Sequence, residues 1–324
     1  KRSGKVKEFD SFLTNAKEKL KTYRDPEQEP GFRFCRGLHA RCVNRPSDAL
    51  VDLNFARTRD AEFRRDATLA MIDIYLYPDP NKLSLEQLQD LTQHSEQHSR
   101  EVELLIHELL QSESQSQFQA TGAQTGGAAH HQGASGMGSA LAGGAGGSSS
   151  STSQAALFAR LRVYQAQNAI FTKKKTEVDR GLQMLMEFYN EDKNFVPGVL
   201  AMAQGLIISK QLTKARNQLK RIAEIARKAY NPDWADDFEK AWLLLADVYI
   251  SQGKYELAST LCHLASMHNR SSGKSWENLG LIYEKEQGHK DAAAHYEKAW
   301  ELSGHSANVG FRLAFNYLKA KRNV

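Results

Sequence analysis

Two histidines have the spacing of a metal site. His94 and His98 stand four residues apart in a stretch predicted to be helical, and this spacing lets two imidazoles chelate zinc. No third ligand lies nearby in the sequence, and the glutamate that follows the first histidine in helical metalloproteases is absent. The adjacent pair His130 and His131 falls in a low-complexity stretch and is weaker still. We therefore expect a solvated helix face here and no metal.

The carboxylates and glycines of the chain give no catalytic pattern. An acidic cluster falls where a helix is expected to begin, and negative charge is favourable at that end of a helix. Its members are Asp233, Asp236, Asp237 and Glu239. The glycine-rich residues 126–147 follow no predicted strand, so they do not read as a phosphate-binding loop. Since no nucleophile and base share a local signature, we predict no catalytic residue, no enzyme activity and no cofactor.

Basic side chains gather on one predicted helix face, and a run of lysines occurs at residues 173–175. The face consists of Arg216, Lys220, Arg221, Arg227 and Lys228. A nucleic-acid site would usually add aromatic residues or a known module, and neither is present. A solvated helix face is the favoured interpretation, the acidic patch of a partner protein comes next, and phosphate binding comes last.

These side chains must be positioned by helices, and residues 240–302 contain a helical pair that occurs twice. One set of large, small and aromatic residues recurs 34 residues further on, and this period and pattern are typical of tetratricopeptide repeats (TPR). Small residues let antiparallel helices approach, while large residues fill the gaps around them. The first set is Trp242, Leu245, Ala246, Tyr249, Ala258, Cys262 and Ala265, and the second is Trp276, Leu279, Gly280, Tyr283, Ala292, Tyr296 and Ala299.

Weaker forms of this pattern predict an all-α, TPR-type α-solenoid of antiparallel helix pairs stacked into a superhelix. Residues 1–110 read as degenerate TPR-like repeats, with Ser47 as the expected N-cap of one helix. Residues 111–153 are of low complexity, rich in Gly, Ser and Ala, and predict a disordered insertion. Residues 154–324 predict further TPR repeats, best defined at 239–306 and truncated at the C-terminus.

Composition narrows the class of protein. The chain has 324 residues, 41% of them hydrophobic, and a formal charge of +5, with no apolar run as long as a membrane span. Three cysteines without close spacing predict neither a disulfide framework nor a zinc site, and they suit a reducing compartment. Cys262 falls at a packing position and reads as a small core hydrophobe. Without an initiator Met or a signal-peptide pattern, the sequence reads as an excerpt of a longer protein.

The groove lined by the first helices of a TPR array often binds peptides. In arrays that serve heat-shock chaperones, the groove carries a clamp of Lys, Asn and Arg for a carboxylate. At the corresponding positions of this sequence, Asn278 and Arg312 match that clamp. Leu243, Asp247 and Asn308 stand where its other members would be needed. Because an aspartate repels an anionic ligand, we predict no carboxylate clamp.

Several segments resemble the large, all-TPR subunit of intraflagellar transport complex A, the ciliary retrograde-transport assembly. They are residues 215–223, 238–247, 283–287 and 313–322. The resemblance covers residues 194–322 and, more weakly, 31–80, whereas residues 83–175 depart from the pattern. It implies a non-catalytic scaffold for other subunits of the complex, with roles in retrograde transport and cargo trafficking. It also implies a place in the cilium or flagellum and in the cytoplasm near the basal body.

Two other functions stay open from the sequence. A peptide-receptor TPR co-factor of a chaperone or import system would bind acidic carboxy-terminal tails. RNA-binding helical repeats would hold RNA at physiological salt. The scaffold interpretation instead predicts protein partners, with the basic face steering acidic surfaces, no nucleic acid and no direct membrane insertion.

Overall fold

The computed structural model describes residues 6–78, 84–89, 96–125 and 148–322, and within these ranges every regular element is a helix. The α-helices in chain order are α1 (Val6–Lys21), α2 (Pro30–Cys42), α3 (Pro46–Arg59), α4 (Ala61–Leu76), α5 (Leu85–Gln89), α6 (Glu96–Thr125), α7 (Ser148–Phe171), α8 (Lys175–Glu191), α9 (Val196–Ile208), α10 (Leu212–Lys228), α11 (Ala235–Ser251), α12 (Tyr255–His268), α13 (Gly273–Lys285), α14 (His289–Leu302) and α15 (Ala307–Arg322). Short 3₁₀ helices, η1 (Pro26–Gln28) and η3 (Pro232–Trp234), lead into α2 and α11. The predicted all-α solenoid is confirmed.

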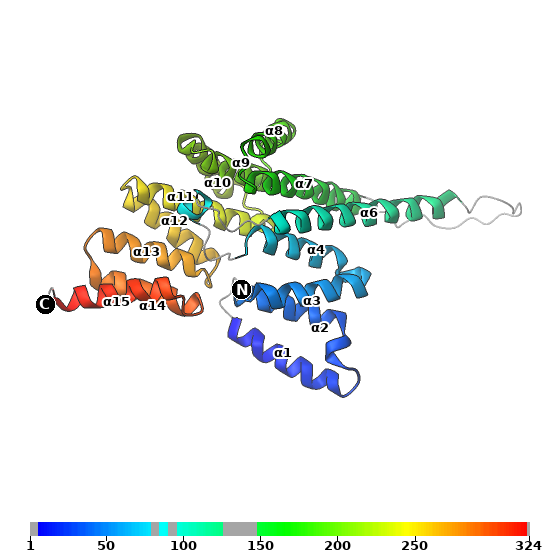
Figure 1. Ribbon diagram of the computed structural model, residues 1–324, viewed down its shortest axis with the longest axis horizontal. Coiled ribbons are helices and arrows are strands. Elements are labelled where there is room, and N and C mark those ends of the chain that lie inside the picture. The colour runs from blue at the N-terminus through cyan, green and yellow to red at the C-terminus, as the bar shows by residue number, and fades with distance from the viewer. Residues whose placement is uncertain (1–5, 79–83, 90–95, 126–147, 323–324) are drawn as a thin grey trace, which may run out of the picture.

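Helices that follow one another in the chain pack against each other. Contacts join α1 through α4 in sequence, and they run without a break from α7 to α15. Figure 1 shows these helices stacked into an arc, with α1–α3 at one end, α13–α15 at the other, and α7–α10 along its crest. Because each pair depends mainly on its neighbours, such a stack presents an extended surface instead of a closed globule.

Small residues set the distance between the two helices of a pair. A Cβ atom added to Gly280 would lie 2.8 Å from the ring of Tyr296, which comes 16 residues later. The same relation holds at Gly37, where a Cβ would lie 2.9 Å from Cγ of Leu53. These distances are shorter than carbon–carbon contact, so the helices can approach this closely only where a side chain is missing or small.

The hydrophobic core follows the stack as a long layer. One cluster of buried residues extends from Ala40 in α2 to Ile282 in α13. A second, smaller cluster lies in α14 and α15 and contains Ala292, Tyr296, Ala299 and Val309. Trp276 packs against both clusters. Packing is therefore continuous along the array, although the last helices have a small core of their own.

Helix starts in the first repeats depend on proline and aspartate. Asp60 caps α4 by accepting the backbone N–H of Glu62 at 2.9 Å. Pro46 takes the first position of α3 with Arg45 as its N-cap, so the expectation that Ser47 caps this helix is wrong. The fixed φ of proline and its missing N–H suit the first helical position, which moves the helix start one residue before the serine.

The predicted insertion differs from the structure at both ends. α6 continues to Thr125 and α7 begins at Ser148, so the structure describes residues 111–125 and 148–153 as helical. A helix that has already formed extends at low cost, and the glutamines and alanines after residue 110 favour that extension. The remaining residues of the insertion, 126–147, lie outside the described residues.

None of the helices in the described ranges has both the length and the apolar character that a membrane span requires.

Gly280→Ala tests the close helix crossing. The added methyl group meets the Tyr296 ring, which is fully buried, so we expect the free energy of unfolding to fall by about 1–3 kcal/mol. Urea denaturation followed by circular dichroism measures the loss. Gly273→Ala is the matched control on the same helix, because its new Cβ would meet nothing closer than 3.5 Å. Equal stability of the two variants would contradict this account of the crossing.

Candidate interaction surfaces

The structure places the predicted repeat residues at the crossings between helices. Trp242 is 1% exposed, and its ring stacks on Phe238 with 6.0 Å between centroids. Trp276 and Tyr283 are half-buried. The others are buried: Leu245, Ala246, Tyr249, Ala258, Ala265, Leu279, Gly280, Ala292, Tyr296 and Ala299. Their surfaces are used inside the stack, so these residues hold the helix pairs together.

Cys262 lies at the same kind of crossing and is fully buried. Burial raises the pKa of its thiol to about 12, so the thiolate needed for nucleophilic attack or metal binding is not formed at neutral pH. The side chain acts as a packing group.

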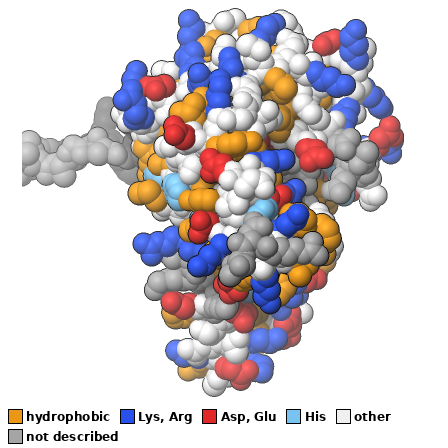
Figure 2. Space-filling model, turned by 90° about the vertical axis from the view of Figure 1, so that its left-hand side faces the viewer, with side chains coloured by type: hydrophobic (Ala, Val, Ile, Leu, Met, Phe, Trp, Pro, Cys, Tyr) orange, Lys and Arg blue, Asp and Glu red, His pale blue; other side chains and the backbone are white. Residues whose placement is uncertain are grey.

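The predicted basic face lies on α10. Its members differ in how exposed they are and in whether they bind other side chains of the chain. Lys220, Arg227 and Lys228 are exposed, and Arg227 pairs with Glu224 at 2.8 Å. The half-buried Arg221 donates to the hydroxyl of Tyr189. Among the described residues no salt bridge engages the two lysines. Figure 2 shows Lys and Arg side chains prominent on the upper part of the face it presents. Three of the five predicted side chains therefore lie at the surface, whereas Arg216 and Arg221 are half-buried.

The groove positions of α11 and α13 do not form a carboxylate clamp. Asp247 Oδ1 accepts the side-chain amide of Asn278 at 2.7 Å, and its Oδ2 accepts the backbone N–H of Leu85 at 3.0 Å. Leu243 is buried. Arg312 lies 3.7 Å from Glu284 and donates to Tyr296. The groove thus has a half-buried aspartate where the clamp would have an asparagine, and Leu243 stands where it would have a lysine.

A buried ionic network, which the sequence analysis missed, lies where α2, α4, α7 and α11 meet. Arg41 donates to Asp73 Oδ2 at 3.1 Å, and the hydroxyl of Tyr164 donates to Asp73 Oδ1 at 2.8 Å. Burial by itself would raise the pKa of Asp73, but the charges of Arg41, Lys240 and Arg160 hold it well below its usual range. Asp73 is therefore ionised at neutral pH, and the nearby cations balance its charge.

The network continues onto α9 and α11. Arg160 donates to Asp237 Oδ2 at 2.8 Å. The Lys240 ammonium lies 3.9 Å from the centroid of the Tyr77 ring, whose hydroxyl donates to Gln204 Oε1 at 3.0 Å. Asp237, which the sequence suggested was only a helix-start charge, is in fact the buried partner of Arg160. The network joins helices from both sides of the predicted insertion.

One sequence signal could have pointed to this network. Asp73 interrupts the otherwise apolar residues 70–76 of α4, and a charge on a buried helix face needs a partner. That partner could not be identified, because Tyr164 comes 91 residues later. Helical periodicity does not predict contacts between residues so far apart in the sequence.

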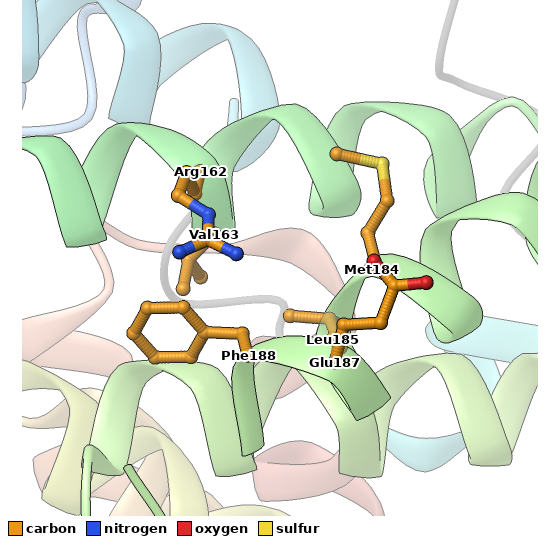
Figure 3. Close-up of a pocket in the computed structure, with 6 residues that line it drawn as sticks. All are labelled: Arg162, Val163, Met184, Leu185, Glu187 and Phe188. Atoms are coloured by element: carbon orange, nitrogen blue, oxygen red, sulfur yellow. The ribbon is translucent and has the colours of Figure 1, made fainter. Parts of the chain in front are cut away.

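A small pocket between α7 and α8 offers no catalytic set. Its volume is about 110 Å³, well below the roughly 300–1,000 Å³ of ligand sites. Figure 3 shows its lining: Arg162, Val163, Met184, Leu185, Glu187 and Phe188. The Arg162 guanidinium lies 5.0 Å from the Phe188 ring centroid and pairs with Glu191 at 2.8 Å. The pocket is thus part of the packing between two helices.

A wider pocket of about 360 Å³ on α2 and α3 is lined by several arginines. Arg36 donates to Asp52 at 2.6 Å and to Glu27 at 2.8 Å. The hydrogen bond from Arg36, with those from Lys17 and Arg33, lowers the pKa of Glu27 to about 2 against the opposing effect of burial. Carboxylates of the chain therefore neutralise these cations, and little positive charge remains for a ligand.

The candidate metal ligands do not come together in the described residues. No group of three or more His, Cys, Asp or Glu side chains there could hold a metal ion. His94, His130 and His131 lie outside those residues, and the ring of His98 packs 5.5 Å from that of Tyr75.

Arg160→Met tests the ionic network. It leaves Asp237 buried without its cation, so we expect the free energy of unfolding to fall by about 3–5 kcal/mol. Replacing both members, as in Arg160→Met with Asp237→Leu, should restore most of that loss, because no unpaired charge remains. Thermal and urea unfolding measure both effects. Arg227→Met, which breaks an exposed pair, is the control and should change little; a loss as large as that of Arg160→Met would refute the role of burial.

Comparison with known proteins assigns the repeats to a family. Residues 148–324 match the model for the tetratricopeptide repeat protein 21 C-terminal ARM domain, and residues 1–76 match that for the TT21 fifth ARM repeats domain. The chain is 36% identical over 330 residues to tetratricopeptide repeat protein 21B of Mus musculus. It is 34% identical over 335 residues to the Homo sapiens protein of that name. Each alignment covers 100% of this chain and 22% of the relative.

Similarity to solved structures is low. A structure of MamA aligns with a TM-score of 0.38 at 20% identity, over 49% of this chain and 89% of that one. A TM-score this low supports no conclusion about function, whereas the sequence relation is direct. The chain spans about a fifth of the length of the curated relatives it matches. Since the C-terminal domain model matches more than half of the chain, the chain belongs to the tetratricopeptide repeat protein 21 family.

Proposed function

We propose that the chain is a non-catalytic protein–protein interaction scaffold of intraflagellar transport complex A, acting in ciliary retrograde transport and cargo trafficking. The coarser part of this function, a TPR-type scaffold, follows from the family and from the stacked helices. The ciliary assignment is supported by the resemblance of residues 194–322 to the all-TPR subunit of that complex. The corresponding location is the cilium or flagellum and the cytoplasm near the basal body.

The observation that carries the scaffold role is the arc of helix pairs. A stack held together by neighbour contacts presents extended faces, which suits a protein that binds several partners at once. Its interior is used for packing, and the two pockets described above hold neither a nucleophile next to a base nor a metal site. We therefore infer binding to other subunits of the complex, and no catalysis, cofactor or membrane insertion.

A peptide-receptor role for acidic carboxy-terminal tails is the alternative function, and one observation disfavours it. Asp247 lies in the groove where the anion-binding residues of a clamp would be, and it is already hydrogen-bonded. A pull-down with acidic tail peptides separates the two functions, because tight binding that depends on the tail would support the alternative. RNA binding at physiological salt would likewise point away from the scaffold.

Affinity purification of the full-length protein from ciliated cells tests the proposed function. Other subunits of the transport complex should co-purify with it. Recovery of chaperone or import components in their place would overturn the ciliary assignment.

Charge reversal on α10 tests the basic face as a partner-binding surface. Lys220→Glu with Lys228→Glu should lower the yield of co-purified partner at least five-fold, because an acidic partner surface would then be repelled. The control, Lys285→Glu with Lys290→Glu, makes the same change in net charge at exposed positions on α13 and α14 and should keep the wild-type yield. If the two double variants behave alike, the face on α10 has no specific role.

A further inference from the structure

The groove side of α9 and α11 is already occupied by a segment of the chain itself. α5 contacts α9 and α11, although it comes more than a hundred residues before either helix. Figure 1 shows α5 in cyan against the yellow α11. Within the described residues this segment, 84–89, forms one short helical turn.

Leucines hold this turn in the groove. Leu88 is 2% exposed and belongs to the same buried cluster as Leu200 of α9 and Leu243 of α11. Leu85 is half-buried and packs against that cluster. The intervening Glu86 is exposed. Two leucines three residues apart lie on one side of a helical turn, so the groove accepts the pattern Leu-x-x-Leu.

Charged side chains hold the two ends of the same turn. The backbone N–H of Leu85 donates to Asp247 Oδ2 at 3.0 Å, and Asn278 fixes the other carboxylate oxygen at 2.7 Å. At the far end, Lys173 Nζ donates to the carbonyl of Gln89 at 3.4 Å. The first N–H groups and last C=O groups of a helical turn lack partners within it. The groove therefore recognises a short helix by its ends as well as by its leucines.

The contact between α5 and the groove is weak enough for another segment to replace α5. Burying two leucine side chains is favourable, but ordering the backbone of six residues costs a comparable amount. Attachment to the chain adds to the buried leucines and the end contacts by keeping the local concentration of the turn high. A segment of the same chemistry on another protein meets the same groove and competes for it.

We propose that the groove side of α9 and α11 is a binding site for a partner protein's short helical Leu-x-x-Leu segment, and that α5 is the resident occupant which such a segment displaces. The proposal rests on the scaffold function but not on the ciliary assignment, and it gives that scaffold a binding site that the chain itself closes.

Fluorescence anisotropy with a labelled peptide tests the proposal. The peptide carries the sequence of residues 84–89, Ser-Leu-Glu-Gln-Leu-Gln, flanked by alanines and acetylated at its N-terminus. The protein is the whole chain, either wild type or with Leu85→Ala and Leu88→Ala. Because these changes weaken the resident turn, the double variant should bind the peptide at least ten-fold more tightly than wild type. Glu86→Ala is the control, since it leaves both leucines in place and should behave as wild type.

Adding Asp247→Ala to the double variant should lower peptide affinity again at least five-fold, because the acceptor for the first N–H is lost. Equal affinity of wild type and double variant, with the helical circular dichroism of both intact, would overturn the proposal. So would an absence of any effect of Asp247→Ala. These outcomes do not depend on co-purification from cells, so failure here is distinct from failure of the ciliary role.

A measurement on the wild-type chain covers the case in which the double variant does not fold. An excess of unlabelled peptide should speed hydrogen exchange at the amide of Leu85 at least three-fold, because displacement frees this N–H from Asp247. A scrambled peptide with the leucines adjacent should leave the rate unchanged. Exchange that does not respond to the Leu-x-x-Leu peptide would refute displacement.

Discussion

The close approach of two antiparallel helices at a missing or minimal side chain is the constraint on which this structure depends. At Gly280 the partner helix presents Tyr296 within a distance that no Cβ would allow. At Ala246 and Cys262, one repeat earlier, both members of the crossing are fully buried. Each crossing fixes the geometry of one pair, and the repetition of that geometry along the chain produces the arc.

The ionic network connects helices that are distant in the sequence, which the crossings between neighbouring helices do not. Crossings act between neighbours, whereas Asp73 and Arg160 bind side chains of helices that are distant in the sequence. A buried charge tolerates few arrangements, because each must place an opposite charge within reach. The network therefore selects one way of joining the helices before the predicted insertion to those after it, while apolar packing alone would accept several.

The sequence predicts the parts of this structure that are locally periodic. The 34-residue recurrence identifies Trp242 and Trp276 as equivalent, and the pairs α11–α12 and α13–α14 follow from it. It does not predict that α5 packs on α9 and α11, because a single turn is too short for periodicity to indicate which helices it contacts. Nor does it predict the bond from Leu85 to Asp247, which spans 162 residues. Contacts at that range depend on how the whole stack curves, and no local pattern encodes the curvature.

The two-part hydrophobic core makes stability uneven along the array. α14 and α15 share a small cluster of their own, and Trp276 is the half-buried side chain that packs against both clusters. Cooperativity in a repeat protein passes through such interfaces from one unit to the next. The crossing of Gly280 on α13 with Tyr296 on α14 therefore ties the terminal cluster to the long layer. A change that loosens this crossing would let α14 and α15 open in subglobal fluctuations while the layer from α2 to α13 stays folded.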